Sequence, residues 1–375
     1  MIYKKFQDLQ LSSLGMGCMR LPLIDGEDSK IDVEKTEEMI RYAMENGVNY
    51  YDTAWPYHGG NSETVMGEIL SKYPRDSFYL ATKFPGFDLS NMGKVKEIFP
   101  KQLEKLKTDY FDFYLFHNVC EKNVDLYLDS QYGVYDYLIK MRDEGKIRHL
   151  GFSAHGDLAC MRKFLDAYGK DMEFCQIQLN RVDWILQDAK GKIDLLNEYN
   201  IPVWVMEPVR GGKLAEIQPE YKKFIEGKRD IPDVEWNFRF LQSIPEVIVT
   251  LSGMSNFDQL KQNIEIFNTD APLNADEFES LMKITKSELG KNTLPCTACR
   301  YCTSHCPMEL DIPELISRYN EDVISGGGFM ARMYMESIPE NRRPSACIGC
   351  KSCEAVCPQG IAISEMMSDF TERLK

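Results

Sequence analysis

The sequence NYYDTAWPYHGGNSETVMGEILSKY, residues 49–73, contains one unit of the pattern that decides the fold. It begins with a short β-type run, Asn49–Ala54, and continues after a turn into Thr64–Tyr73, where apolar residues recur at helical spacing. β-branched and aromatic runs of this length are typical of strands, whereas apolar residues every three or four positions are typical of helices. We therefore expect a strand followed by a helix.

This alternation of strand and helix recurs over most of the chain. The predicted strands are Leu14–Arg20, Asn49–Ala54, Phe78–Lys83, Phe111–His117, His149–Ser153, Phe174–Asn180, Val203–Pro208 and Val247–Gly253. Further helical patterns lie between them, at Val95–Leu106, Tyr135–Met141, Cys160–Ala167, Val234–Leu241 and Leu260–Phe267. Eight such units in about 270 residues match a (β/α)8 TIM barrel in number and length.

An open, doubly wound α/β sheet is the alternative architecture. It would need a glycine-rich loop that leads from the first strand directly into a helix. The segment Gly15-Met-Gly-Cys-Met-Arg20 lacks the third glycine and leads into Leu21-Pro22 instead. The barrel is therefore favoured.

Two cysteine runs near the C-terminal end share the spacing C-x2-C-x2-C-x3-C-P. They comprise Cys296, Cys299, Cys302 and Cys306, and Cys347, Cys350, Cys353 and Cys357. This spacing is a bacterial-ferredoxin signature for two 4Fe–4S clusters, in which the fourth cysteine of a run ligates the other cluster. We expect one cluster on the first three cysteines of the first run plus Cys357, and the other on the first three of the second run plus Cys306.

Zinc is the main alternative metal for these cysteines. Structural zinc sites usually contain two separated C-x2-C pairs, without a third cysteine two residues further on and a fourth before proline. Nothing in the sequence indicates the secretion that disulfides require. The remaining cysteines, Cys18, Cys120, Cys160 and Cys175, are interpreted as small buried core residues.

The chain is expected to divide into a large and a small domain. Residues 1–270 are assigned to the barrel, 271–292 to a helical connection and 293–375 to a ferredoxin-like domain with two clusters. A long spacer separates the two cysteine runs. It contains a helical pattern, Ile312–Ile324, followed by a break at Gly326–Gly328. This length favours a mostly helical domain over the compact ferredoxin fold.

Composition limits the classes of partner. The 375 residues are 43% hydrophobic and 27% charged, as in ordinary globular proteins. A net charge of −14 argues against a nucleic-acid partner. No segment approaches the roughly 20 apolar residues of a membrane span, and no signal-peptide core is present. Because thiolates and clusters need a reducing environment, we expect a cytoplasmic protein without a membrane partner.

Polar residues occur at the carboxyl ends of the predicted strands, where barrel enzymes carry their chemistry. They include Asp52, Tyr57, Lys83 and His117. With the segment Tyr51–Glu68, this set resembles the aldo-keto reductase family, and the cysteine runs extend the resemblance to the branch with a C-terminal 4Fe–4S domain. The resemblance implies a (β/α)8 barrel and an Asp, Tyr, Lys, His catalytic tetrad formed by these four residues.

The implied tetrad suits hydride transfer from a nicotinamide to a carbonyl carbon. Negative charge develops on the carbonyl oxygen, and Tyr57 would donate a proton to it. A phenol has an ordinary pKa near 10, so we expect Lys83 to lower the pKa of Tyr57. Asp52 would keep Lys83 charged and in place, and His117 would orient the substrate oxygen.

The resemblance also implies contacts to the cofactor. Ser153 and Gln176 match the positions that hold the nicotinamide carboxamide, although Ala154 replaces the usual asparagine. Met206 takes the place of a stacking aromatic ring, and Arg210 belongs either to a pyrophosphate contact or to a flexible surface loop. The candidates for the adenosine part are Ser255, Asn256, Gln259 and Asn263.

The visible cations for a 2′-phosphate are Lys261 and Arg210, so NADH and NADPH both stay open, and so does a bound flavin. Three functions follow. The first is reduction of a carbonyl, or oxidation of an alcohol, coupled through two clusters to a ferredoxin or another redox partner. The second is a flavin-binding or cluster-fed reductase of another small molecule, and the third is an electron-transfer subunit with a non-catalytic barrel. The candidate pocket residues are Trp55, Phe84, Phe87 and Trp184.

Overall fold

The computed structural model describes residues 1–296 and 298–375. The chain forms two compact units. Unit 1 comprises Met1–Ile217 and Lys228–Phe278, and unit 2 comprises Gln218–Gly227 and Glu279–Lys375. Each unit has an apolar core of its own. Among the described residues, no helix combines the length and the apolar character needed to cross a membrane.

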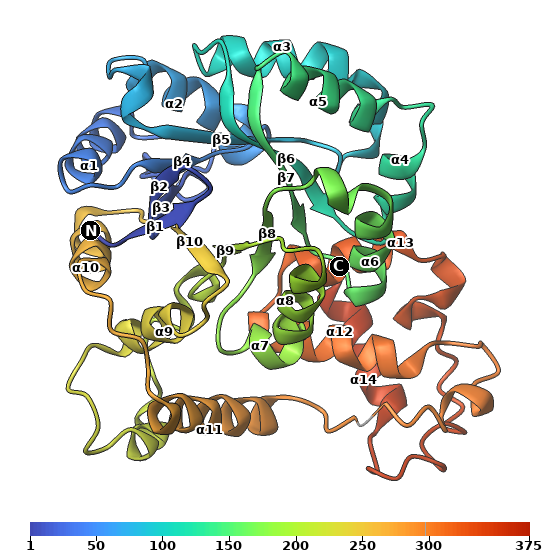
Figure 1. Ribbon diagram of the computed structural model, residues 1–375. Helices are drawn as coiled ribbons and strands as arrows, with labels where there is room; N and C mark the ends of the chain where they lie inside the picture. The colour runs from blue at the N-terminus through green and yellow to red at the C-terminus, as the bar shows by residue number, and fades with distance from the viewer. Residues whose placement is uncertain (297) are drawn as a thin grey trace. The chain divides into compact units, whose positions relative to one another are not determined.

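Unit 1 is built around a closed barrel of parallel strands (Figure 1). Around the barrel the order is β10-β3-β4-β5-β6-β7-β8-β9, so strands that follow one another in the chain are neighbours. The strands are β3 (Leu14–Gly17), β4 (Tyr50–Asp52), β5 (Tyr79–Phe84), β6 (Phe111–Val119), β7 (Ile147–Ala154), β8 (Cys175–Gln178), β9 (Val203–Met206) and β10 (Val247–Ser252). Each predicted strand coincides with one of these, and the predicted barrel is confirmed.

Helices connect the strands and lie on the outside of the barrel (Figure 1). They are α1 (Val33–Glu45), α2 (Ser62–Leu70), α3 (Val95–Lys105), α4 (Val124–Leu128), α5 (Val134–Asp143), α6 (Leu158–Tyr168), α7 (Asp183–Leu186), α8 (Ala189–Glu198), α9 (Asp233–Gln242) and α10 (Phe257–Phe267). The helices predicted from the sequence correspond to α2, α3, α5, α6, α9 and α10.

An N-terminal hairpin, which the sequence analysis did not predict, precedes the barrel. Strand β1 (Tyr3–Phe6) pairs antiparallel with β2 (Leu9–Ser12). Phe6 and Leu11 join the apolar cluster inside the barrel, where the Phe6 ring lies edge-on to Trp204 with 5.1 Å between ring centroids. Buried aromatic residues contribute strongly to core stability. The hairpin therefore fills one end of the barrel interior.

Strand alternation explains why polar side chains gather at the other end. Tyr50 on β4, Ala81 on β5 and Leu115 on β6 all belong to the interior cluster. Side chains two residues apart on a strand face the same side. The next inward positions toward the carboxyl ends of β4 to β9 are therefore Asp52, Lys83, His117, Ser153, Gln176 and Met206.

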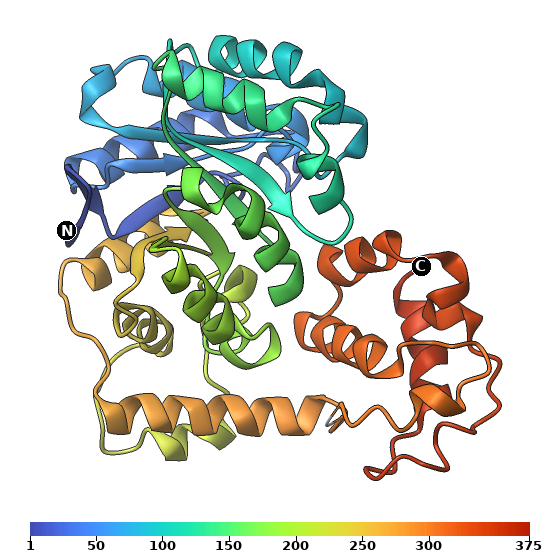
Figure 2. The ribbon, with the colours of Figure 1, turned by 45° about the vertical axis from the view of Figure 1, so that its right-hand side comes forward.

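Unit 2 is mainly helical in its described residues (Figure 2). Helix α11 (Ala275–Asn292) leads into it from the end of unit 1, and α12 (Ile312–Ser325), α13 (Phe329–Ser337) and α14 (Ile363–Arg373) follow. The last three contribute apolar residues to one core. Helix α12 ends at Gly326, whose positive φ of 62° stops the helix where the glycine run predicts a break. The prediction of a mostly helical C-terminal region is confirmed.

Candidate functional site

Lys83 forms a buried ion pair at the carboxyl end of the barrel. Its Nζ atom donates to Asp52 Oδ1 at 2.5 Å and to the Thr53 carbonyl at 2.9 Å, and lies 3.4 Å from the Tyr57 hydroxyl. Lys83 is 1% exposed and Asp52 is 3% exposed. Residues from β4, from β5 and from the turn after β4 therefore meet at one point.

A short 3-10 turn, Tyr57–Gly60, carries the phenol back over the barrel end. Inside it, His58 and Gly59 have φ values of 56° and 63°. A left-handed residue other than glycine costs about 1–2 kcal/mol, so His58 needs support. The buried imidazole accepts from the Leu21 amide at 3.2 Å through Nε2, and its Nδ1 lies 2.9 Å from the Asp28 carbonyl. These contacts hold the turn that positions Tyr57.

Burial and charge act in opposite directions on these groups. Burial lowers the pKa of Lys83, but Asp52 and then Tyr57 outweigh it, so the pKa of the ammonium ends above its ordinary value. Burial raises the pKa of the Asp52 carboxyl, against the opposing effect of Lys83. Burial also raises the pKa of the Tyr57 phenol more than Lys83 lowers it. The expectation of a net lowering at Tyr57 is wrong, and the phenol keeps its proton at neutral pH.

His117 borders the same space. Its ring lies edge-on to Tyr57, with 6.2 Å between centroids and an interplanar angle of 81°. Burial, followed by the charges of Lys83 and His155, lowers the pKa of His117 well below its ordinary value. The imidazole is therefore neutral, and one of its nitrogens can donate a hydrogen bond to a ligand.

The four candidate pocket residues have different surroundings. Phe87 packs edge-on against His117, with 5.3 Å between ring centroids, and so lies next to one of the four residues of the implied tetrad. Phe84 is fully buried. Trp184 packs against two other phenylalanines, and the Lys105 ammonium lies over the ring of Trp55. Of these four, Phe87 has the contact that suits a substrate-facing role.

Four buried polar atoms at this end of the barrel lack a hydrogen-bond partner in the described part of the chain. They are Asp52 Oδ2, His117 Nδ1, Gln176 Oε1 and Arg210 Nη1. An unsatisfied buried polar group costs about 1–3 kcal/mol, so such groups usually have a partner. Their concentration here fits a site that binds a polar ligand.

Ser153 and Gln176 lie side by side on β7 and β8, because they are register partners. The Ser153 hydroxyl accepts from the Asn118 amide at 2.8 Å, which fixes its position. An amide ligand that bridges Ser153 and Gln176 would satisfy the unpartnered Gln176 oxygen. Met206 ends β9 and is partly exposed. The arrangement therefore fits a nicotinamide carboxamide.

Arg210 is 7% exposed, so of its two sequence-based alternatives its side chain does not fit a flexible surface loop. Its Nη2 atom lies 3.1 Å from Asp183 Oδ1. Asp183 is fully buried and also accepts hydrogen bonds from Gln178, at 3.0 Å, and from Asn180. The guanidinium is therefore held in place while its second amino group stays available to a ligand.

The candidate adenosine-binding residues already have structural roles. Asn256 caps α10 by accepting from the Gln259 amide at 3.0 Å, and the Gln259 side chain accepts from the Ser255 amide at 2.8 Å. Asn263 donates to a serine hydroxyl of β10 at 3.0 Å. Lys261 lies over two aromatic rings. These contacts fix the conformation of the segment after β10. Few cations in this segment are available to bind a phosphate.

Arg20, which was not among the residues predicted for the site, is a cation beside this segment. The Arg20 carbonyl accepts from the Ser255 hydroxyl at 2.9 Å, and the guanidinium lies 3.1 Å from Glu207 Oε1. A Cβ atom at Gly253 would lie 2.9 Å from the Cβ of Arg20, and Gly211 has a positive φ of 63°, so both positions favour glycine. These two glycines, one at the end of a predicted strand and one three residues after another, were the available sequence signal.

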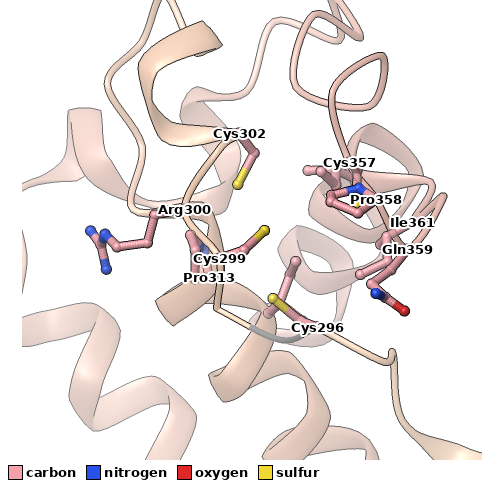
Figure 3. Close-up of a pocket in the computed structure, with 11 residues that line it drawn as sticks. Cys296, Cys299, Arg300, Cys302, Pro313, Cys357, Pro358, Gln359 and Ile361 are labelled. Atoms are coloured by element: carbon pink, nitrogen blue, oxygen red, sulfur yellow. The ribbon is translucent and has the colours of Figure 1, made fainter.

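A cavity in unit 2 is lined by cysteines from both runs (Figure 3). The cysteines are Cys296, Cys299, Cys302 and Cys357, and the apolar lining includes Pro313, Ile316, Ile361 and Ile363. These are the four cysteines expected for one cluster. Burial raises the pKa of Cys353 to about 11, and the neighbouring thiols of Cys306 and Cys347 add to this. Cys306 therefore lies near the second run, as the exchange of fourth ligands requires.

The donor set fits an iron–sulfur cluster. Four thiol groups surround an apolar space, which is the ligand chemistry of such clusters. In residues 1–296 and 298–375, no three His, Cys, Asp or Glu side chains converge closely enough to hold a single metal ion. A tetrahedral zinc site would need four ligands about 2–2.3 Å from one ion.

The two cysteine loops share one backbone shape. Left-handed φ values occur at three equivalent positions of the two loops. Ala298 and Gly349 have φ values of 53° and 67°, and Arg300 and Lys351 have 63° and 61°. Glu309 and Gly360 have 51° and 61°. Residues other than glycine seldom adopt this conformation. Both loops keep the shape whether or not glycine is present, so the loop geometry itself is the repeated feature.

Comparison with known proteins identifies the family. The sequence model of the Aldo/keto reductase family matches residues 13–286, and that of the 4Fe-4S dicluster domain matches residues 295–362. The chain therefore belongs to the aldo/keto reductase family, it is an oxidoreductase, and it carries a C-terminal 4Fe-4S dicluster domain. The resemblance noted in the sequence is confirmed.

Individual relatives agree with this assignment. The chain is 26% identical over 318 residues to the "Uncharacterized oxidoreductase YqkF" of Bacillus subtilis, which covers 76% of this chain and 96% of that protein. It is 26% identical over 225 residues to the "NADH-specific methylglyoxal reductase" of Escherichia coli. This match covers 56% of this chain and 67% of that protein. The structure of "aldo-keto reductase AKR11C1 from Bacillus halodurans (holo form)" matches with a TM-score of 0.62 at 26% identity. This match covers 76% of this chain and 96% of that chain.

Proposed function

We propose that this protein reduces a small-molecule carbonyl with hydride from a nicotinamide, or oxidises the alcohol in reverse, and exchanges single electrons through two 4Fe–4S clusters. The observation that carries the proposal is the contact of Tyr57 with the Lys83–Asp52 ion pair beside neutral His117. A proton donor, a fixed positive charge and a neutral hydrogen-bond donor are the groups that carbonyl reduction needs.

Each member of the tetrad has one role in this proposal. Tyr57 donates its proton to the oxygen on which negative charge develops, and Lys83, 3.4 Å away, stabilises the phenolate left behind. Asp52 holds the ammonium in place, and His117 donates a hydrogen bond that orients the substrate oxygen. The raised pKa of Tyr57 keeps the proton on the phenol until the substrate oxygen becomes more basic.

The cofactor is proposed to lie across the carboxyl ends of β7 to β10. The nicotinamide supplies the hydride when it is bound. Ser153 and Gln176 would hold its carboxamide, whereas Arg20 and Arg210 are the cations available to its phosphates. The E. coli relative is named as NADH-specific, which makes NADH the first cofactor to test.

The clusters are proposed to use the eight cysteines as two sets with exchanged fourth ligands. Cys296, Cys299, Cys302 and Cys357 would hold one cluster, and Cys347, Cys350, Cys353 and Cys306 the other. A 4Fe–4S cluster supplies one-electron chemistry. A hydride carries two electrons, so each of the two clusters would carry one electron of the pair to or from the partner, which is expected to be a ferredoxin or another single-electron carrier in a reducing cytoplasm.

The test uses anaerobically purified protein with both cysteine sets loaded. Turnover of 4-nitrobenzaldehyde and methylglyoxal is measured with NADH and NADPH, and nicotinamide binding is measured by calorimetry. The Tyr57→Phe variant is expected to lose at least about 10²-fold in kcat, the usual range for removing a general acid, with unchanged cofactor binding. Tyr3→Phe, at an exposed residue of the N-terminal hairpin, is the control. Wild-type turnover by Tyr57→Phe, or no binding of either nicotinamide, would overturn the proposal.

A further inference from the structure

A buried polar network lies behind the proposed catalytic pair. Its centre is Glu63, at the start of α2, which is 0% exposed. Glu63 Oε1 accepts hydrogen bonds from Thr82 Oγ1 at 2.8 Å and from Gln102 Nε2 at 2.7 Å, and Oε2 accepts from Lys105 Nζ at 3.1 Å. One carboxylate therefore joins α2 to β5 and to α3.

Lys105 links this carboxylate to the turn that carries Tyr57. Its Nζ atom donates to the Gly60 carbonyl at 3.0 Å and lies 4.2 Å from the centre of the Trp55 ring. Trp55 precedes Tyr57 and Gly60 follows it, so one ammonium contacts the turn on both sides of the phenol. A lysine over a tryptophan face is attracted by the ring as well as by the carbonyl.

Gln102 links the same carboxylate to the strand of Lys83. Its Nε2 atom also donates to the Lys83 carbonyl at 3.0 Å, and its Oε1 accepts from the Tyr114 hydroxyl at 2.6 Å. Hydrogen bonds in a buried network reinforce one another, because the surrounding dielectric is low. The network therefore connects the Tyr57 turn and Lys83 through protein groups that lie outside the substrate space.

We propose that Lys105 is a positioning residue that sets the distance between Tyr57 and Lys83, and thereby the rate of proton transfer to the substrate. This inference rests on the proposed function, since it takes Tyr57 as the proton donor. A misplacement of about 1 Å at a reacting group costs about 10²-fold in rate. Without the ammonium of Lys105, the Gly60 carbonyl loses its link to Glu63, and the Trp55 ring loses the cation that lies over it.

The test compares substitutions at two lysines of α3. Lys105→Met removes the ammonium and keeps the apolar stem, whereas Lys105→Arg keeps the positive charge. The matched control is Lys101→Met, because Lys101 is an exposed lysine one turn earlier on the same helix. With NADH and 4-nitrobenzaldehyde, Lys105→Met is expected to lower kcat about 10- to 100-fold with less than about a twofold change in the KM for NADH. Lys105→Arg recovers most of the rate, and Lys101→Met matches the wild type.

An isotope effect separates positioning from loss of folded protein. NADH deuterated at the transferred position is compared with ordinary NADH. A smaller folded fraction lowers kcat without changing the isotope effect. A misplaced proton donor slows the chemical step itself, so the isotope effect on kcat rises in Lys105→Met. Wild-type kcat together with a wild-type isotope effect would overturn the positioning role.

A second variant covers the case in which Lys105→Met does not fold. The double substitution Glu63→Gln, Lys105→Met removes both charges, so no buried carboxylate is left uncompensated. It is expected to show the same lowered kcat and raised isotope effect, and wild-type values would again reject the idea. If Tyr57→Phe keeps full turnover, the proposed function itself fails. If Tyr57→Phe loses activity while the Lys105 variants keep it, only the positioning role fails.

Discussion

Lys83 Nζ lies 2.5 Å from Asp52 Oδ1, and both side chains are almost completely buried. Removing one charge from a buried pair typically costs about 3–5 kcal/mol. Asp52→Asn is therefore expected to lower the free energy of unfolding in urea by about 3 kcal/mol. It should also lower the pKa of Lys83, because burial remains while the carboxylate that opposes it is lost.

The catalytic consequence of Asp52→Asn follows from that change in the lysine. A neutral Lys83 no longer stabilises the phenolate of Tyr57, so kcat is expected to fall about 10²-fold. The fall should grow as pH rises, because more of the lysine is then deprotonated. Steady-state rates between pH 6 and pH 9, roughly the span around neutrality, would reveal this trend. A pH-independent rate equal to that of the wild type would contradict the assigned role.

Glu173 gives a prediction for acid stability. Burial raises the pKa of Glu173, but hydrogen bonds from His149 and Gln7 outweigh it, so its pKa lies below the ordinary value of 4.5. A lowered carboxyl pKa stabilises the fold above the ordinary value, and this contribution is lost as pH falls through the folded-state pKa. Glu173→Gln should therefore be about 1–2 kcal/mol less stable than the wild type at pH 7. The two proteins should converge in acid, and denaturant unfolding at both pH values would show it.

Substitution of Arg20 is expected to change the affinity for the nicotinamide cofactor and not the rate of the chemical step. The Arg20 carbonyl accepts a hydrogen bond from Ser255, in the segment after β10, and its guanidinium is paired with Glu207, which follows β9. Arg20→Ala is expected to raise the KM for the nicotinamide about tenfold with little change in kcat, as expected when binding is weakened equally in ground and transition states. Arg162→Ala, at an exposed ion pair on α6, is the control. An unchanged KM in Arg20→Ala would remove this residue from the cofactor site.

Pairs of cysteine substitutions can test the exchanged fourth ligands. If Cys296 and Cys357 hold the same cluster, the double variant Cys296→Ser, Cys357→Ser should lose the iron of one cluster. The pair Cys296→Ser, Cys306→Ser should then disturb both. Iron and sulfide counts after anaerobic purification distinguish the two. If instead the Cys296, Cys306 variant lost the iron of one cluster and the Cys296, Cys357 variant disturbed both, each run would hold its own cluster.

The fold was readable from sequence where local pattern and burial agree. Barrel strands such as Phe111–Val119 are buried along their whole length, so they are rich in apolar and aromatic residues. Helix α1 was not predicted, because four charged residues separate Val33 from the later apolar residues of the helix. The N-terminal hairpin was missed for a similar reason: its strands are four residues long, and the first has one buried residue, Phe6.

The residues of the candidate site that lie at strand ends, or that the family resemblance implies, could be predicted from the sequence. The contact between Arg20 and Glu207 joins residues 187 positions apart, and no local pattern reveals such a pair. The net pKa direction of Tyr57 depends on how deeply the phenol is buried, and the sequence does not show that depth. The Lys105 contacts depend in turn on how α3 packs against the Tyr57 turn.

The hairpin that fills the amino end of the barrel has a consequence for solvent exchange. Phe6 and the aromatic residues around it occupy the interior below the ion pair. If the proposed function holds, we expect water that exchanges protons with the Lys83 ammonium to enter from the carboxyl end of the barrel, where the substrate would bind. A bound substrate would then separate the ammonium from bulk water, and exchange would resume once the product leaves.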